Sequence, residues 1–446
     1  MVAVGDEVPA GAERLDVDGC VVPGLTDAHV HFPSWALARE ELQAFGAPGP
    51  DAVVAAVRDA LPVEGWLRGR GWRDAGWTEA PHRAQLDEVC GDVPVALRSH
   101  DGHSLWLSSA ALAHADGPLD VPGGVVERDP DGEPTGVLRE EAAWAFFDRH
   151  AAASDEEVRA AMRRAQAGVV AVHDKDGGRG APEHFAALGE IPLRVWQSRP
   201  AGDPGEADYA KAFMDGALGS RTAWLLDGSG VCITDAGGLA RMIEEEAARR
   251  RPVAVHAIGD LANRQALDAF ERTRPLWGPL GLRHRIEHAQ CVAPEDVPRF
   301  ASIGVAASVQ FTHATSDRDL VDTIWADRVG HAYPFRSLLA SGAVLAGGSD
   351  APVEPLDPVA GLRAAVLRTD DDRPPWRPEQ AIDAAAALRS FTSAPAWLEG
   401  AEDERGRLAP GMAADLVVLS HDPLGPGLAE ARVLATMVAG TWVSGG

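Results

Sequence analysis

Two histidines separated by one residue, His29 and His31, are the first pattern in the chain that could do chemistry. They end a short apolar segment bounded by Pro23-Gly24 and Pro33. Alternate residues of a β-strand point to the same face, so in a strand both imidazoles can hold one cation. The pair alone is a weak signal, because half-buried or surface histidines give the same spacing.

Three later segments end in groups that also bind metals. His256 and His288 each follow an apolar run, and so does Asp350. A single buried histidine is usually structural, but several ligand-type residues at predicted strand ends together indicate a metal centre. Imidazole and carboxylate ligands suit zinc or a similar divalent ion.

Lysine is rare in this chain, which has thirty-nine arginines but only Lys175 and Lys211. Lys211 lies in an apolar run, Tyr209–Met214, that ends in a turn, so we expect it near the end of a strand. A buried lysine can lose its proton, and the neutral amine can add CO2 to become a carbamate, which arginine cannot do. The alternative is a surface lysine without a role, which is our interpretation of Lys175.

These ligand-type residues fit either two metal ions or one. All six would be used by two ions about 3.5–4 Å apart, with an N6-carboxylated Lys211 between them. The alternative is one ion held by His29, His31, His256 and Asp350. Lys211 would then be a charged neighbour of that ion. The six are His29, His31, Lys211, His256, His288 and Asp350.

In either arrangement the metal lowers the pKa of bound water towards about 7. Asp350 could then accept a proton as hydroxide attacks a carbonyl carbon, and deliver it to the leaving nitrogen. We therefore expect Asp350 to be both a ligand and the catalytic base and acid.

The elements that must position these residues alternate along the chain. Short apolar runs are separated by Ala-, Arg- and Glu-rich stretches such as Asp155–Gln166, Gly238–Arg250 and Leu261–Arg274, which predicts an α/β chain of parallel β/α units. Eight strands suit a (β/α)8, or TIM, barrel with its catalytic groups at the carboxyl ends of the strands. The expected strands are Leu25–His31, Val169–His173, Leu193–Gln197, Ala210–Met214, Val253–His256, Arg285–His288, Val305–Val309 and Val344–Gly348.

A large insertion after strand 1 interrupts this alternation. A structureless loop from Phe32 to Gly168 would be implausible. Strand-like pieces at Val93–Arg98 and Gly124–Arg128 predict instead a lid-like subdomain over residues 35–165. Its tryptophans either line an apolar pocket or pack a core of their own.

A small β domain is expected outside the barrel, which itself spans residues 25–401. It would combine residues 1–24 with residues 402–446, where Asp415–Ser420 and Val433–Val443 are β-like. Its N-terminal part is short, because 28 residues precede His29.

Composition excludes several classes of function. The net charge of -26 makes nucleic-acid binding unfavourable, because an acidic surface repels phosphate. No apolar run approaches the ~18 residues of a membrane span, and the first residues do not resemble a signal peptide. The four cysteines lie far apart and fit a reducing cytoplasm. We expect a cytoplasmic protein that acts on a small molecule; a homo-oligomer is compatible with the sequence.

The motifs as a set resemble the amidohydrolase superfamily, and within it the amidohydrolase-3, or YtcJ-like, group, which includes N-substituted formamide deformylases. The resemblance covers nearly the whole chain and implies a metal-dependent (β/α)8 hydrolase with the ligands above, Lys211 falling where relatives carry a carboxylated lysine. The segments that carry it are Val22–His31, Gly69–Trp72, Asp101–His103, Asp215–Ala223, His256–Asp260, Glu287–Gln290, Gln310–Asp317, Gly348–Val353 and Gly406–Leu416.

Five further residues are candidates for substrate binding. Asp101 and His103 lie in the insertion and could reach the substrate if it is a lid, or they could only shape a turn. Gln310 and His313 follow the seventh strand and are expected at the mouth of the barrel. Arg221 could bind a substrate carboxylate, although tying down its own loop is the favoured interpretation.

The function expected is hydrolysis of a non-peptide C–N bond, such as an N-formyl or N-acyl amide, by metal-activated water. Alternatives are a cyclic amidohydrolase, an ester or lactone hydrolase, or a catalytically impaired scaffold protein on the same fold. Deamination is less favoured, because Gly259-Asp260 follows His256 where deaminases of the superfamily often carry a glutamate.

Overall fold

The computed structural model describes residues 17–62, 65–165 and 168–444. The chain forms two compact units. The first comprises Met1–Phe32, Ala165–Met214 and Thr234–Gly446, and the second comprises Pro33–Arg164 and Asp215–Ile233. Residues 1–16 of the predicted small β domain lie outside the described residues, and the predicted domain boundaries stay a prediction.

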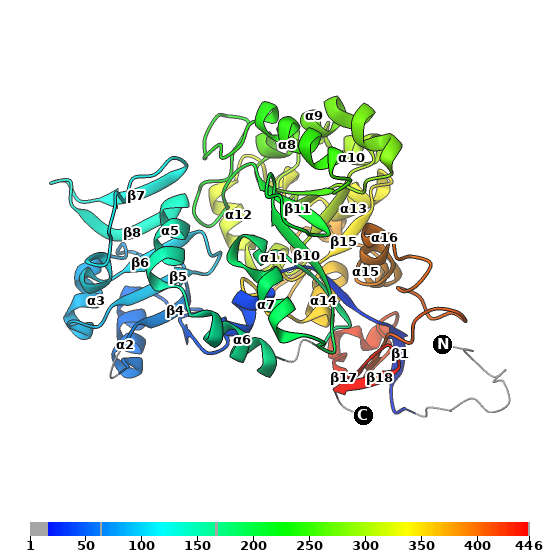
Figure 1. Cartoon of the computed structure of the whole chain (residues 1–446), viewed down its shortest axis with the longest axis horizontal. Coiled ribbons are helices and arrows are strands. Elements are labelled where there is room, and N and C mark those ends of the chain that lie inside the picture. The colour runs from blue at the N-terminus through cyan, green and yellow to red at the C-terminus, as the bar shows by residue number, and fades with distance from the viewer. Residues whose placement is uncertain (1–16, 63–64, 166–167, 445–446) are drawn as a thin grey trace. The chain divides into compact units, whose positions relative to one another are not determined.

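The first unit contains the predicted barrel of eight parallel strands (Figure 1). Hydrogen bonding runs in the order β15-β14-β13-β12-β11-β10-β9-β2, so strands consecutive along the chain are neighbours in the sheet. This confirms the expected fold class. The strands are β2 (Thr26–Val30), β9 (Ala171–Asp174), β10 (Arg194–Pro200), β11 (Tyr209–Phe213), β12 (Val253–Ala257), β13 (Arg285–His288), β14 (Ala306–Val309) and β15 (Leu345–Gly347).

Backbone hydrogen bonds between the ends of the first and last strands bring the barrel nearly to closure. His31 N donates to Ala351 O at 2.8 Å, and Asp350 N donates to His29 O at 2.7 Å. A Cβ on Gly348 would lie 2.4 Å from His29 N, so this close approach requires glycine. Closure therefore brings the histidine pair beside the predicted aspartate.

Small and β-branched residues fill the interior. All five residues of β12 are buried, as expected for a parallel strand covered on both faces. Ala28, Ala306 and Ala346 pack with Leu398 of α16 (Ser393–Glu399) in one cluster. The apolar runs of the sequence are thus the walls of the barrel.

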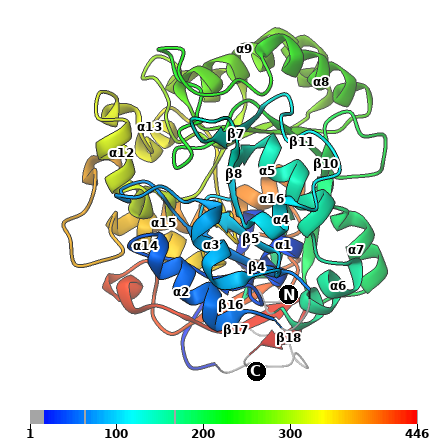
Figure 2. The same ribbon diagram turned by 90° about the vertical axis from the view of Figure 1, so that its left-hand side faces the viewer.

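Helices cover most of the outer face of the barrel. Helix α8 (Ala236–Ala248) begins where Asp235 caps the Gly238 N–H. It packs beside α9 (Asp260–Trp277), and the two lie together in both views (Figures 1 and 2). The others are α7 (Ala181–Leu188), α10 (Val297–Ile303), α11 (His313–Ser316), α12 (Arg318–Ile324), α13 (Phe335–Ala340), α14 (Pro358–Leu367) and α15 (Ala384–Ser390).

The connection from β10 to β11 departs from the regular β/α pattern. Residues 201–208 form turns and loop without a helix. The outer side of β10 consequently stays half exposed and borders a groove of about 1050 Å³ between α7 and the Val438-Ala439 turn.

A four-stranded antiparallel sheet lies outside the barrel. Its order is β1 (Cys20–Pro23), β16 (Leu416–Leu419), β17 (Val433–Val438) and β18 (Thr441–Ser444). The run predicted as one strand, Val433–Val443, is two, because Ala439 and Gly440 take positive φ and turn the chain back.

The second unit is built on a six-stranded sheet of its own. The strand order is β3 (Leu42–Gln43), β4 (Leu67–Trp72), β5 (Val95–Ser99), β6 (Ser104–Leu107), β8 (Pro134–Glu140) and β7 (Gly124–Arg128). Trp72 and Trp106 are fully buried and pack with Trp77, so these three tryptophans form a core. The helices include α2 (Pro50–Ala60), α3 (Arg83–Cys90), α5 (Glu141–Phe146) and α6 (Asp155–Arg164).

The segment Asp215–Ile233, which follows strand β11, belongs to this second unit. Its Ser220 Oγ donates to Asp101 Oδ2 at 2.9 Å, and its Thr222 hydroxyl bonds the carboxylate of Glu140. The sequence interpretation had limited the unit to the insertion. Among the described helices, none is both long and apolar enough to cross a membrane.

Candidate metal centre

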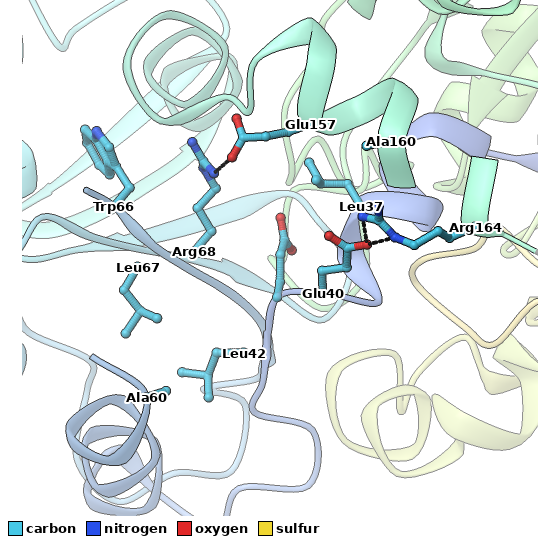
Figure 3. Close-up of a pocket in the computed structure, with 11 residues that line it drawn as sticks. Leu37, Glu40, Leu42, Ala60, Trp66, Leu67, Arg68, Glu157, Ala160 and Arg164 are labelled. Atoms are coloured by element: carbon cyan, nitrogen blue, oxygen red, sulfur yellow. Dashed lines mark hydrogen bonds and ion pairs between the residues drawn. The ribbon is translucent and has the colours of Figure 1, made fainter. Parts of the chain in front are cut away.

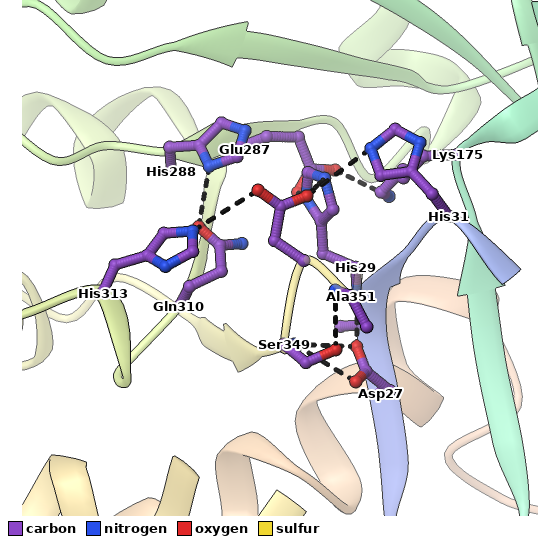
Figure 4. Close-up of polar contacts among 12 residues, drawn as sticks. Asp27, His29, His31, Lys175, Glu287, His288, Gln310, His313, Ser349 and Ala351 are labelled. Carbon is purple, nitrogen blue, oxygen red and sulfur yellow. Dashed lines mark hydrogen bonds and ion pairs between the residues drawn. The ribbon is translucent and has the colours of Figure 1, made fainter. Parts of the chain in front are cut away.

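His29 in strand β2 and His31 just after it direct their Nε2 atoms toward one carboxylate (Figure 4). His29 Nδ1 lies 2.7 Å from Glu287 Oε2, and its Nε2 lies 3.0 Å from Asp350 Oδ1. His31 Nδ1 lies 2.8 Å from Asp176 Oδ1, and its Nε2 lies 3.5 Å from the same Asp350 oxygen. A carboxylate on Nδ1 fixes the tautomer whose Nε2 can bind a metal.

Two groups of possible ligands share Asp350. His29, His31 and Asp350 offer ligand atoms that all lie within 4.8 Å of one another, and so do His288, His313 and Asp350. His313 Nε2 lies 3.4 Å from Asp350 Oδ2, whereas His29 and His31 face the other oxygen, Oδ1. Asp350 therefore has one oxygen on each side of the centre.

Gln310 orients one of these histidines. Its Oε1 lies 2.8 Å from His288 Nδ1, which leaves His288 Nε2 free to face the centre (Figure 4). Gln310 is 2% exposed. The sequence had placed it among substrate contacts, whereas this geometry makes it a partner of a ligand; a contact with substrate stays a prediction.

His256 and Lys211 complete the set of predicted ligands. The rings of His256 and His288 have centroids 4.5 Å apart. Lys211 Nζ is buried, lies 4.7 Å from the centre of the Phe213 ring, and makes no hydrogen bond to the described part of the chain. Neither residue belongs to the two three-residue groups above.

Burial and charge set the protonation of the centre. Burial lowers the pKa of the Lys211 amine to about 8, against the opposing effect of Glu287 and Asp350. Despite burial, Asp350 and Glu354 raise the pKa of His313 to about 10, and Asp176 and Asp350 raise that of His31 to about 9. Burial instead lowers the pKa of His29 and of His288, so the imidazoles of the site fall into two groups.

Glu287 is itself held by two buried cations. Lys175 Nζ lies 2.9 Å and Arg285 Nε lies 2.8 Å from Glu287 Oε1. Both side chains are almost fully buried, so the interpretation of Lys175 as a surface lysine was wrong. A buried carboxylate needs such partners, because an unpaired buried charge is very costly.

Glu287 and His288 are neighbours in the chain, yet both lie against His29. Alternation would turn Glu287 and His288 to opposite faces, but His288 has a φ of 74° and Ala289 a φ of 45°. The left-handed backbone at the strand end lets His288 reach the centre from the mouth while Glu287 reaches His29 from inside the barrel. Asp350 also has a positive φ, of 60°.

Asp27 ties the first and last strand ends together. Its Oδ1 accepts hydrogen bonds from His29 N and Ser349 N, each at 3.0 Å (Figure 4). The sequence analysis assigned no site role to Asp27, Asp176 or Glu287. The available signal was a carboxylate within three residues of a histidine.

Three of the residues predicted to bind substrate, Asp101, His103 and Arg221, lie in the second unit. His103 Nδ1 lies 2.7 Å from Glu140 Oε2. Asp101 accepts hydrogen bonds from Ser99, Ser220 and the His103 N–H. Burial raises the pKa of the Asp101 carboxyl, but His103 and these hydrogen bonds lower it by more. Arg221 is exposed, with a φ of 58°. Their role in binding substrate stays a prediction.

The second unit also encloses a cavity of about 510 Å³ (Figure 3). Trp66, Leu37 and Leu42 line it together with two ion pairs, Arg68–Glu157 and Arg164–Glu40. These charges neutralise one another, so the cavity offers no unsatisfied group for catalysis. The catalytic chemistry available in the described residues is concentrated at the barrel mouth.

The donor set fits a divalent metal. Imidazole nitrogens and a carboxylate are the ligands of zinc and similar ions, and the orphaned Lys211 amine lies among the same charges. Neutral imidazoles oriented by carboxylates are what such an ion requires.

Comparison with known proteins agrees with this geometry. The model of a family described as the amidohydrolase family matches residues 16–445. The chain is 31% identical to YtcJ of Bacillus subtilis, an amidohydrolase by name, over 95% of this chain and 88% of that protein. It is 28% identical to the N-substituted formamide deformylase of Arthrobacter pascens, over 97% and 89% of the two chains. A crystal structure of an uncharacterized metal-dependent hydrolase from Pyrococcus horikoshii matches with a TM-score of 0.73 and 26% identity, over 92% and 88%.

Proposed function

This chain belongs to the amidohydrolase family, and we propose that it hydrolyses a non-peptide C–N bond, of the N-formyl or N-acyl amide type. The observation that carries the proposal is Asp350, whose two oxygens face histidines on opposite sides of one centre. The likeness to a formamide deformylase over nearly the whole chain supports this substrate class.

The proposed ligands are His29, His31, His256, His288, Lys211 and Asp350. Zinc suits this set best, because imidazoles and a carboxylate are its usual oxygen and nitrogen ligands. When bound, such an ion polarises a carbonyl group and makes water more acidic.

Asp350 is the proposed base and acid. It takes a proton from the water whose oxygen forms the new bond to the carbonyl carbon. It returns this proton to the nitrogen as the C–N bond breaks, so that a carboxylic acid and an amine leave. Next to Asp350 Oδ2, His313 is proposed to donate a hydrogen bond to the substrate.

Lys211 is proposed to carry an N6-carbamate. Its neutral amine would form a bond to the carbon of CO2 and release a proton, which gives two oxygens in place of an unpartnered nitrogen. Support comes from the burial of Nζ and its lack of a hydrogen bond within the described residues. With the carbamate the centre holds two ions; without it, one ion on His29, His31, His256 and Asp350 is the alternative.

Five residues are proposed as substrate contacts. Asp101, His103 and Arg221 are the candidates from the second unit, and Gln310 and His313 those from the barrel. Of these, Arg221 is exposed and could pair with a substrate carboxylate.

The test is metal analysis combined with a substrate panel of N-formyl amines, N-acyl amines, cyclic ureides, esters and lactones. We expect bound zinc-class metal and the highest kcat/KM on a formyl or acyl amide, with His29→Ala abolishing both. The control variant is His421→Ala, whose side chain is 45% exposed. A preference for ureides or esters would refute the C–N amide assignment, and protein without metal or activity would indicate a scaffold.

A further inference from the structure

A second cluster of metal-binding side chains lies outside the proposed catalytic centre. Asp260, Cys291 and His331 offer ligand atoms that all lie within 4.8 Å of one another. None of the three belongs to the catalytic set. Asp260 follows His256 by four residues and Cys291 follows His288 by three.

Backbone hydrogen bonds fix the three elements that carry these side chains. Cys291 N donates to Ile258 O at 2.9 Å, and Val292 N donates to His331 O at 3.0 Å. The buried amide of Asn263 donates to Cys291 O and to Gly259 O. The loop after β13, the start of α9 and the 3-10 helix Val329–His331 are thus one rigid scaffold.

This cluster contains a soft sulfur donor, the Cys291 thiol, whereas the proposed catalytic ligands offer only nitrogen and oxygen. A thiol, an imidazole and a carboxylate form a set that suits zinc or cadmium rather than magnesium or calcium. Cys291 and Asp260 are 0% and 1% exposed, whereas the His331 side chain is 30% exposed and gives an ion access from solvent.

One ring nitrogen of His331 has no hydrogen-bond partner among the described residues. Its Nδ1 is buried, finds no hydrogen bond among the described residues, and lies 3.6 Å from Asp260 Oδ2. Such a separation is too long for a hydrogen bond and leaves two donor atoms facing the same point. A cation bound between them would give His331 Nδ1 a partner.

Arg328 is the competing cation. Its Nη1 lies 3.5 Å from Asp260 Oδ2, while its Nη2 makes a closer pair, at 2.9 Å, with Asp327. A metal bound to Asp260 would have to displace this contact, so Arg328 competes with the ion for the carboxylate.

We propose that Asp260, Cys291 and His331 form a second, thiolate-containing site for a zinc-class divalent ion, separate from the hydrolytic centre. On binding, the S–H bond of Cys291 breaks, its electron pair forms the sulfur–metal bond, and the proton leaves to solvent. The site would join the strand ends that carry His256 and His288, so its occupancy would stiffen the mouth of the barrel. This inference does not depend on the proposed substrate.

Cadmium titration of the metal-loaded enzyme tests the site, because thiolate-to-cadmium charge transfer absorbs in the ultraviolet and the catalytic centre contains no cysteine. We expect one thiolate-bound cadmium per chain and release of a proton. Cys291→Ser should remove the absorption, while Cys232→Ser and Cys90→Ser, which alter an exposed and a buried cysteine, should keep it.

Two further variants keep the test decisive if Cys291→Ser does not fold. His331→Gln should weaken cadmium binding about tenfold or more, since it removes a ligand. Arg328→Gln should strengthen binding, since it removes the competing cation. Absorption that is absent in the wild type, or unchanged in both Cys291→Ser and His331→Gln, would overturn the proposal and leave Asp260 as an ion-pair partner of Arg328.

Discussion

His29 shows how a single metal ligand depends on residues that never touch the metal. Its backbone N–H is held by Asp27, its Nδ1 by Glu287, and its Nε2 faces Asp350. The ring is therefore held in one orientation before any ion binds. Residues that set tautomer and orientation usually affect metal affinity by about 10–100-fold.

Glu287→Gln tests this dependence at the level of one charge. The amide keeps the shape of the side chain but leaves Lys175 and Arg285 without their shared anion. We expect the free energy of unfolding to fall by about 3–5 kcal/mol and metal affinity to fall about 10–100-fold. Urea unfolding and metal competition would measure the two effects.

The matched control is Glu271→Gln, which also removes an arginine partner but at a 63% exposed side chain. Exposed pairs contribute little, so we expect its unfolding free energy to stay within about 1 kcal/mol of the wild type. Equal losses in the two variants would contradict the role given to Glu287.

Lys211→Met tests the carbamate, because methionine fills similar space but cannot add CO2. We expect metal content to fall and kcat to drop by two or more orders of magnitude, on the order of what loss of a bridging ligand causes. Added short-chain carboxylates, which can supply the missing oxygens, should restore part of the activity. Full activity without them would show that Lys211 is only a neighbour of the centre.

At the scale of elements, the backbone at the strand ends decides where the proposed ligands point. β13 places Arg285 and Glu287 inside the barrel by simple alternation, and the left-handed residues His288 and Ala289 then break that alternation. Backbone strain of this kind persists only where surrounding contacts enforce it and is common at functional sites. One short strand thereby supplies both a ligand and the partner of another ligand.

The loop before β13 contains a buried histidine that predicts a pH dependence of stability. His284 Nδ1 accepts a hydrogen bond from Val253 N, and burial lowers the pKa of the ring to about 3. Between pH 3 and about 6.5 the unfolded chain binds a proton at this histidine and the folded chain does not. The free energy of unfolding is therefore highest above about pH 6.5 and decreases as the pH is lowered below that value.

This histidine should lower the free energy of unfolding by about 3 kcal/mol between pH 7 and pH 4.5. Urea unfolding of His284→Gln across this range should show a shallower pH dependence than the wild type. His421→Gln, at an exposed position, should keep the wild-type dependence. Identical slopes for His284→Gln and wild type would remove His284 as the cause.

At the scale of the whole molecule, the metal centre links elements from several parts of the barrel. Its proposed ligands come from β2, β11, β12 and β13 and from the segments directly after β2 and β15. An ion bound by several strands stabilises the folded barrel by mass action, by about 2.7 kcal/mol at a hundred times its Kd.

Metal removal should therefore lower the melting temperature of the wild type. Differential scanning calorimetry with and without a chelator would measure the shift, and added zinc should reverse it. In His29→Ala the chelator should have a much smaller effect. A wild-type melting temperature that ignores the chelator would show that the proposed ligands hold no ion important for stability.

The sequence predicted the barrel well because parallel strands buried on both faces are continuous apolar runs. All eight predicted strands overlap an observed one, and the ligand-type residues lie at or near their ends except Lys211, which is the middle residue of β11. It did not predict the helix-free connection after β10, nor that Asp215–Ile233 packs in the second unit. Composition carries little information on such loops, because long-range contacts decide their course.

The sequence by itself determined which residues could bind a metal and that parallel strands would carry them, since residue type and local periodicity are written in the chain. Only the tertiary structure decided how those residues are held. Lys175 was assigned to the surface, yet barrel closure and the left-handed turn at His288 bring it into contact with Glu287 beneath His29. Such contacts join residues far apart in the chain, and no local pattern encodes them.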